Sequence, residues 1–168
     1  MPRTLKSVLA TFPAVLFYAG VLPWLSIRLD QWFGLMTRFP LWLEIVGLIV
    51  AVSGGAIAVW SALMLATLGR GSPNPMMPTS RLVTTGPFGY SRNPLMIGGW
   101  LFGAGLACVL HSPSMLALVA LIVLVGLIYV RVIEEPGMIA RFGETYEEYA
   151  RHTPRWLILL LVIAAFAQ

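Results

Sequence analysis

The sequence predicts an all-α integral membrane protein: a bundle of four transmembrane helices with a cytoplasmic amphipathic helix near the C-terminus. Hydrophobic residues make up 58% of the 168 residues and charged residues only 11%, whereas soluble domains contain about a quarter charged residues. Four apolar runs are close to the roughly 20 residues that a helix needs to cross a bilayer. Polar residues concentrate between these runs, so residues 1–168 are expected to form a single membrane-embedded domain.

Two transmembrane helices are expected within residues 1–68. The first, about residues 7–29, follows basic residues as a signal peptide does, but it lacks a clear cleavage site and is interpreted as a retained anchor. The second covers about residues 41–68. Small residues recur in it at every fourth position, a stripe that lets helices approach closely in lipid; these are Gly54, Ala58 and Ala62. A short polar connection between the two helices is marked by Arg28, Asp30 and Arg38.

Residues 69–93 form a long polar connection rich in proline. Loops of this length in compact proteins are usually functional or disordered, and the prolines favour an ordered binding loop. Asn before Pro is disfavoured in a helix and Pro suits the first helical position, so Asn93 is predicted as the N-cap of a third helix that Pro94 opens. The free N–H groups of this helix start attract anions, although a plain loop entering a transmembrane helix fits equally well.

The third and fourth runs are predicted to form a helical hairpin, about residues 94–110 and 113–133. The sequence Ser112-Pro113 supports this, because it is a capping residue followed by a first-position proline. Glycines at a GxxxG spacing are typical of helix packing, but they also let a flat ligand lie against the backbone; here they are Gly99 and Gly103.

After the fourth run, Pro136-Gly137 is expected to break the helix. An amphipathic helix is predicted over about residues 138–151, with one face that lies in the membrane interface or covers a pocket; this face holds Met138, Phe142, Tyr146 and Tyr149. The last apolar segment, residues 157–168, is too short to cross a bilayer upright. Re-entrant, interfacial and short-span arrangements all fit it.

The basic residues orient this multi-pass bundle. With the N-terminus inside, two of the eleven Lys and Arg residues, Arg28 and Arg38, lie on the outer side, which leaves nine on the inner side. Because positive charge accumulates on the cytoplasmic side of membrane proteins, both termini and the connection at residues 69–93 are expected there.

Two classes of ligand are excluded by composition. No metal site is expected, because Cys108 is the only cysteine and the two histidines, His111 and His152, lie far apart without metal-ligand spacing. No nucleic-acid partner is expected either, because the basic residues are spread along the membrane edges, where their charge has a topological meaning.

The predicted hairpin brings Asn93, at the start of one helix, near Glu134, at the end of the other. A polar hollow is therefore expected at the cytoplasmic mouth of the hairpin, with a helix N-terminus, the carboxylates of Glu134 and Glu135, and flanking arginines. Such a hollow suits a charged, soluble molecule that meets a lipid-borne one.

Three stretches carry a resemblance to a known family: LVTTGPFGYSRNPLMIGG at residues 82–99, the pair EE at 134–135, and RFGETYEEYARHTPRW at 141–156. In order and spacing the chain resembles the isoprenylcysteine carboxyl methyltransferase and phospholipid methyltransferase superfamily over about residues 69–156. The resemblance implies an integral membrane enzyme that uses S-adenosylmethionine and releases S-adenosylhomocysteine. It also implies direct in-line methyl transfer to a lipophilic acceptor from the membrane, with a carboxylate or an amine as the nucleophile.

Site residues follow from the same resemblance by position. The residues implied to contact the cofactor are Leu82, Val83, Phe88, Asn93, Pro94, Leu95, Met96, Glu134 and Glu135. Two arginines, Arg131 and Arg92, are the candidates for holding an anionic group of the acceptor during catalysis. The chain departs from the family pattern at several positions: Asn93 stands where many members have His, Phe88 and Met96 stand where Tyr is common, and the substrate-orienting arginine falls on Val130, one residue before Arg131.

Two other functions are compatible with a membrane protein of this size. A non-catalytic scaffold or small transporter is one, but transport usually needs an ionisable residue at mid-bilayer depth, and the apolar runs hold none there. A nicotinamide-dependent membrane reductase on a related scaffold is the other. The chain has no extra basic cluster for a phosphorylated nicotinamide cofactor, which favours the methyltransferase.

Overall fold

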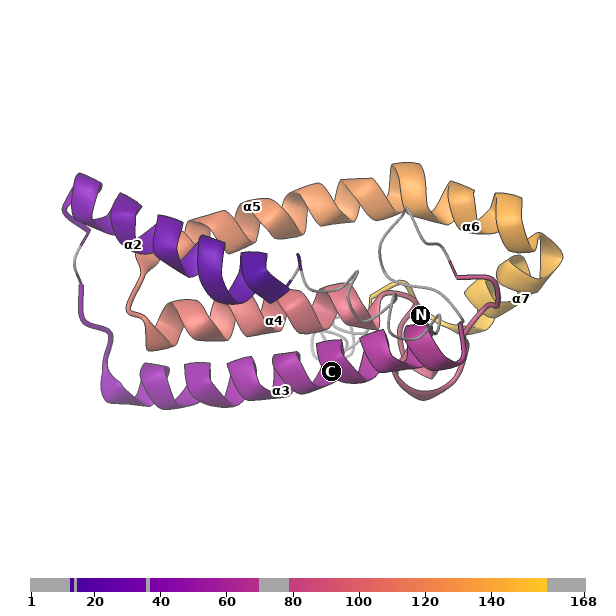
Figure 1. Ribbon diagram of the computed structural model, residues 1–168, viewed down its shortest axis with the longest axis horizontal. Coiled ribbons are helices and arrows are strands. Elements are labelled where there is room, and N and C mark those ends of the chain that lie inside the picture. Colours follow the sequence, from indigo (N-terminus) through magenta and orange to yellow (C-terminus); the bar gives the residue numbers. More distant parts are fainter. Residues whose placement is uncertain (1–12, 14, 36, 70–78, 157–168) are drawn as a thin grey trace, which may run out of the picture.

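The computed structural model describes residues 13, 15–35, 37–69 and 79–156, and every regular element within them is helical. Four helices lie roughly side by side and alternate in direction (Figure 1): α2 (Leu22–Phe33), α3 (Leu41–Thr67), α4 (Pro94–Val109) and α5 (Pro113–Tyr129). The connections α2–α3 and α4–α5 lie at one end of the bundle. The opposite end carries the short helices α6 (Glu135–Phe142) and α7 (Glu144–His152).

The expected second, third and fourth apolar runs correspond to α3, α4 and α5 almost residue for residue. Single-turn elements complete the described chain: a π-helical turn at Phe17–Val21, a 3₁₀ turn at Gly86–Gly89 and a π-helical turn at Val130–Glu134. The predicted C-terminal segment at residues 157–168 lies outside the described residues, as do residues 70–78 of the long connection and the start of the first run.

The predicted polar connection after residue 29 is wrong in its position, because α2 continues to Phe33 and includes Arg28 and Asp30. The physical reason is that Asp30 does not face water. Its side chain is buried, and its carboxylate accepts hydrogen bonds from the Ser112 hydroxyl and, at 2.9 Å, from the Ser114 N–H. A carboxylate that is satisfied in this way needs no solvent-exposed loop.

The turn between α4 and α5 is capped as predicted. Ser112 Oγ accepts a hydrogen bond from the Met115 N–H at 3.1 Å, and Pro113 follows at the first helical position. Asp30 adds a second acceptor to the same helix start, so α2 is joined to this turn by a charged group at a helix N-terminus, where negative charge is favourable.

Glycines allow α3 and α4 to approach with backbone against backbone. A Cβ added at Gly54 would lie 2.5 Å from the Phe102 backbone nitrogen, and one at Gly98 would lie 2.6 Å from the Ala58 nitrogen. This confirms the predicted packing role of Gly54 and Ala58. Gly99 and Gly103 are covered differently: the ring of Tyr18 lies 3.7–3.8 Å from the position that a Cβ would take at either glycine.

The predicted helix break at Pro136-Gly137 is also wrong. The helix that begins at Pro113 continues to Phe142, and the break comes at Gly143, whose φ of 53° favours glycine. Proline lacks an N–H and its ring collides with the carbonyl four residues earlier in an α-helix. Here the π-helical turn at Val130–Glu134 ends two residues before Pro136, which stands in the first turn of α6. The wider turn lets the chain pass the proline without ending the helix. The amphipathic stretch is therefore divided between α6 and α7.

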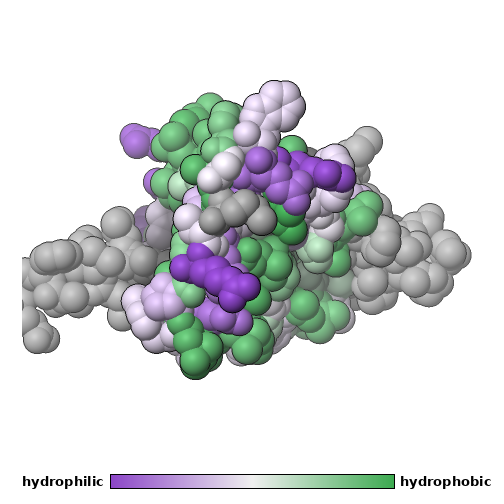
Figure 2. Space-filling view, turned by 90° about the vertical axis from the view of Figure 1, so that its left-hand side faces the viewer, coloured by the Kyte–Doolittle hydropathy of each residue, from purple (hydrophilic) through white to green (hydrophobic). Residues whose placement is uncertain are grey.

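Two helices are long and apolar enough to cross a membrane: Leu41–Thr67 and the continuous helix Pro113–Phe142. Only 17% and 11% of their most apolar stretches are buried inside the described structure. Large hydrophobic side chains therefore point outward, which is the reverse of a core helix in a soluble protein. Figure 2 looks onto the end with the α2–α3 and α4–α5 connections, where hydrophilic residues form patches surrounded by hydrophobic surface.

The close contact of α3 and α4 predicts unequal effects for two neighbouring glycines. Gly54→Ala is expected to lower the free energy of unfolding by about 1–3 kcal/mol, because its Cβ collides with the α4 backbone. Gly55→Ala is the matched control. Its Cβ would meet only the Phe102 ring at 3.4 Å, and alanine is the better helix former, so no loss is expected. Thermal unfolding of both variants in detergent tests this, and equal stability of the two would contradict it.

Candidate functional site

A cavity of about 540 Å³ lies at the end of the bundle where the loop before α4 meets α6 and α7. Of the nine predicted cofactor-binding residues, eight line it: Leu82, Val83, Phe88, Asn93, Leu95, Met96, Glu134 and Glu135. Arg92 lines it too. The structure thus brings Asn93 and Glu134 to one hollow, as the hairpin predicts.

Two of the predicted residues lie elsewhere. Pro94 is buried in the first turn of α4 and does not line the cavity, so its contribution is to start the helix. Arg131 is exposed in the π-helical turn and is also not among the lining residues. Of the two arginines considered for the acceptor, only Arg92 faces the cavity.

Glu135 is the electrostatic centre of the site. Its carboxylate is buried and pairs with Arg92, whose Nη1 lies 2.7 Å from Oε1. The guanidinium of Arg155 binds the same carboxylate through two bonds: Nε donates to Oε1 at 2.8 Å, and Nη2 donates to Oε2. This interaction raises the pKa of Arg155. Both oxygens of Glu135 are therefore occupied by protein donors.

Glu134, by contrast, lines the cavity without an ion pair in the part of the chain that the structure describes. Among the described residues, the charge of Glu134 is partly compensated by Arg141, which lines the cavity too. The two adjacent glutamates thus have different surroundings: Glu135 is neutralised by two arginines, and the carboxylate of Glu134 remains free to accept hydrogen bonds from a ligand.

Arg92 has one donor that is not used. Its Nε–H is buried and has no hydrogen-bond partner among the described residues. A buried donor without a partner costs free energy comparable to a lost hydrogen bond. Arg92 also lines the cavity, so this unsatisfied donor belongs to a side chain of the cavity wall.

The start of α4 supplies further donors. Its first α-helical hydrogen bond runs from the Ile97 N–H to the Asn93 carbonyl at 3.2 Å, so the N–H groups of Leu95 and Met96 have no partner within the helix. Asn93 occupies the N-cap position as predicted, but its side chain does not cap the helix. Instead, Nδ2 donates to the Arg155 carbonyl at 3.4 Å.

Helix α7 closes the cavity with two tyrosines. The Tyr149 hydroxyl donates to the Phe88 carbonyl at 2.6 Å, and Tyr146 is almost completely buried beside it. Burial raises the pKa of both phenols. These are the residues that the sequence predicts on the apolar face of an amphipathic helix, and they line the cavity together with Met138.

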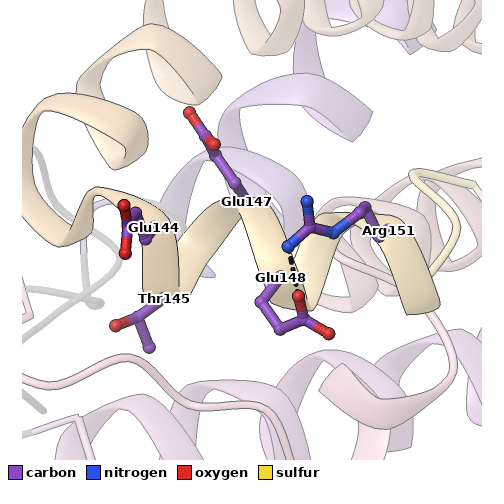
Figure 3. Close-up of a pocket in the computed structure, with 5 residues that line it drawn as sticks. All are labelled: Glu144, Thr145, Glu147, Glu148 and Arg151. Carbon is purple, nitrogen blue, oxygen red and sulfur yellow. Dashed lines mark hydrogen bonds and ion pairs between the residues drawn. The ribbon is translucent and has the colours of Figure 1, made fainter.

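The opposite face of α7 is a separate, open hollow on the surface (Figure 3). Its lining residues are Glu144, Thr145, Glu147, Glu148 and Arg151. Glu148 and Arg151 form an exposed ion pair across one turn of the helix. Such a pair contributes little to stability, and the other side chains in the view are spread along the helix without a common focus. Because these residues do not line the cavity, substitutions on this face serve as controls for substitutions in the cavity.

Sequence reasoning missed Arg155. It lies in the stretch at residues 141–156 that carries the resemblance, but the charge pattern around it does not indicate its role, because its partner lies 20 residues away. The two histidines lie apart: His152 is exposed on α7, and His111 accepts a hydrogen bond from the Phe39 N–H at the other end of the bundle. No cluster of metal-ligating side chains occurs within the described ranges.

A family model for phospholipid methyltransferases matches residues 42–145 of the chain. The matched region runs from α3 to the start of α7 and contains Arg92, Asn93, Glu134 and Glu135, but it ends before Arg155. Comparison with curated proteins and with solved structures finds no match.

Removing the charge of Glu135 is expected to destabilise the fold. Glu135→Gln leaves the Arg92 guanidinium, which is only 14% exposed, without its counter-ion. A broken buried ion pair costs about 3–5 kcal/mol, and the partial exposure of Arg155 places the expected loss near the lower limit. Chemical denaturation in detergent measures the change. Glu148→Gln, at the exposed pair in Figure 3, is the control and should leave stability unchanged; a similar loss in both would contradict this role for Glu135.

The phenol of Tyr149 predicts a pH dependence. Because burial raises its pKa in the folded protein, the folded state retains this proton above pH 10, where an exposed tyrosine loses it. The contribution to stability is therefore complete below about pH 10 and falls at higher pH. Unfolding temperatures between pH 8 and 11.5 should decrease more steeply for the wild type than for Tyr149→Phe. Parallel curves would show that this phenol does not titrate as described.

Proposed function

Because the chain belongs to the phospholipid methyltransferase family, we propose that it is an S-adenosylmethionine-dependent enzyme that methylates a lipophilic acceptor resident in the membrane. The family is one of membrane methyltransferases that act on lipids, which supports both the reaction class and the location. The nature of the acceptor group, a carboxylate or an amine, is left to experiment.

The observation that carries this proposal is the combination of unused groups in one cavity. S-adenosylmethionine has a carboxylate, an ammonium group, two ribose hydroxyls and an adenine ring. The cavity offers free N–H donors at the start of α4, the carboxylate of Glu134 and the ring of Phe88. Its volume of about 540 Å³ lies within the range of about 300–1,000 Å³ that is usual for small-molecule sites. The residues present therefore fit the cofactor.

We assign the residues as follows. The N–H groups of Leu95 and Met96 hold the cofactor carboxylate, since a helix start favours an anion. Glu134 accepts from the ammonium group or the ribose. Phe88 packs on the adenine, with Leu82 and Val83 beside it. Arg92, which lines the cavity, holds an anionic group of the acceptor.

The bound cofactor supplies an electrophilic methyl group on a sulfonium. The protein contributes orientation and exclusion of water, which can account for much of the rate acceleration of a transfer between two bound molecules. No histidine lines the cavity among the described residues. An acceptor carboxylate needs no base, whereas an amine has to reach the cavity in its neutral form.

The same proposal includes a multi-pass membrane topology with four spanning helices in a single domain. Large hydrophobic side chains on the outer faces of α3 and α5 would contact lipid. The helix Pro113–Phe142 is about 45 Å long at 1.5 Å per residue, against a hydrocarbon core of about 30 Å. Its α6 end, and with it the cavity, would therefore lie at the headgroups. The excess of basic residues on that side supports a cytoplasmic site and cytoplasmic termini.

Binding of S-adenosylhomocysteine in detergent tests the proposal. Calorimetry on the wild type should show binding, and Glu134→Gln should weaken it at least tenfold, because the free carboxylate is lost. Glu144→Gln changes an equally charged residue on the open face of α7 (Figure 3) and should leave the affinity unchanged. Absence of binding to the wild type would refute the cofactor assignment.

The acceptor can be identified with the same preparation. Wild-type protein, a total lipid extract and S-adenosylmethionine carrying a deuterated methyl group should give a labelled lipid by mass spectrometry. Glu134→Gln should abolish the label.

A further inference from the structure

We infer that Arg155 is a positioning residue for the proposed reaction: through Glu135 and through its own backbone, it holds the turn at residues 91–93 that presents Arg92 and the start of α4 to the cavity. This inference rests on the proposed function for its consequence, but its structural content can be tested without a ligand. It assigns a role to a residue that lies outside the region matched by the family model.

The side chain of Arg155 acts through Glu135. It binds both oxygens of Glu135 and leaves that carboxylate 12% exposed. The same carboxylate holds Arg92 at 2.7 Å. Without Arg155, Glu135 would have Arg92 as its single partner. The second oxygen of Glu135 would then be free to accept a further hydrogen bond from the Arg92 guanidinium, which would turn into a bidentate geometry. The direction of the unused Nε–H of Arg92 therefore depends on Arg155.

The backbone around Arg155 accepts hydrogen bonds from the turn before α4. The Arg92 N–H donates to the Pro154 carbonyl at 3.0 Å, and the Ser91 hydroxyl donates to the Arg155 carbonyl at 3.0 Å. Asn93 Nδ2 donates to the same carbonyl at 3.4 Å. Three consecutive residues before α4 are thus bound to two consecutive carbonyls of the C-terminal segment.

Aromatic and backbone contacts anchor this C-terminal segment. The Trp156 ring lies 5.0 Å, centroid to centroid, from the Trp100 ring on α4, and Thr153 is buried with its N–H bonded to the Tyr149 carbonyl at 3.0 Å. These contacts hold the segment on either side of Arg155. Within the described residues, the salt bridge to Glu135 is the only ion pair between this segment and the cavity wall. Arg155 therefore ties this segment to the same carboxylate that holds Arg92.

The consequence is a division of roles between the two neighbouring glutamates. Glu135 positions protein groups, because three donors from two arginines bind its oxygens, whereas the carboxylate of Glu134 is the one proposed to contact the ligand. Arg155 does not line the cavity, so its loss should weaken binding through the displaced turn.

The test compares Arg155→Ala with Arg155→Lys and with Arg151→Ala. Arg151 is a matched control on the same part of the chain, because its ion pair with Glu148 is exposed and remote from the cavity (Figure 3). Amide hydrogen exchange without ligand should become at least tenfold faster at residues 91–93 in Arg155→Ala, intermediate in Arg155→Lys, and unchanged in Arg151→Ala. Unchanged exchange at residues 91–93 in a folded Arg155→Ala protein would overturn the inference.

Affinity for S-adenosylhomocysteine provides the second readout. Arg155→Ala should bind at least tenfold more weakly than the wild type, with partial recovery in Arg155→Lys and wild-type affinity in Arg151→Ala. Wild-type affinity in Arg155→Ala would overturn the positioning role while leaving the proposed function intact. If the wild type itself does not bind, the proposed function fails, and the exchange measurement still decides whether Arg155 holds the turn. A thermal unfolding curve for each variant identifies any that is not folded.

Discussion

The buried carboxylate of Glu135 is the group on which the arrangement of the site depends. A carboxylate at this depth needs opposite charge and several hydrogen bonds, because the cost of removing it from water is several kcal/mol. Arg92 comes from the loop before α4 and Arg155 from the segment after α7. Satisfying this one group therefore brings together three segments that are distant along the chain, and the cavity lies among them.

The other constraint is the close contact between α3 and α4. The backbones approach closely because Gly54 of α3 packs on α4 and Gly98 of α4 packs on α3. This contact fixes the position of the start of α4 along the axis of α3. At the far end, Asp30 and Ser112 fix the turn into α5. With both ends of the hairpin held, the end of the long helix reaches the cavity in only one register.

The π-helical turn at Val130–Glu134 has a consequence for the chemistry of the site. A π turn inserts an extra residue and changes the direction of the side chains that follow it. It ends at Glu134, two residues before Pro136, so the accommodation of the proline and the placement of the two glutamates occur at the same junction of the helix. One carboxylate meets two arginines, and its neighbour faces the cavity. A regular α-helix would have ended or kinked at the proline.

Much of this protein follows from its sequence alone, because the helices are determined by local properties. Apolar runs predict α3, α4 and α5, the Ser112-Pro113 pair predicts the hairpin, and the motifs from Leu82 to Glu135 predict most of the cavity lining. The tertiary structure decided the rest: that Asp30 is buried in a helix, that the helix continues past Pro136 to Gly143, and that Arg155 is the second partner of Glu135. These outcomes depend on pairs of groups far apart in the chain. Eleven basic residues are chemically similar, and only the folded backbone determines which two of them lie within hydrogen-bonding distance of one buried carboxylate.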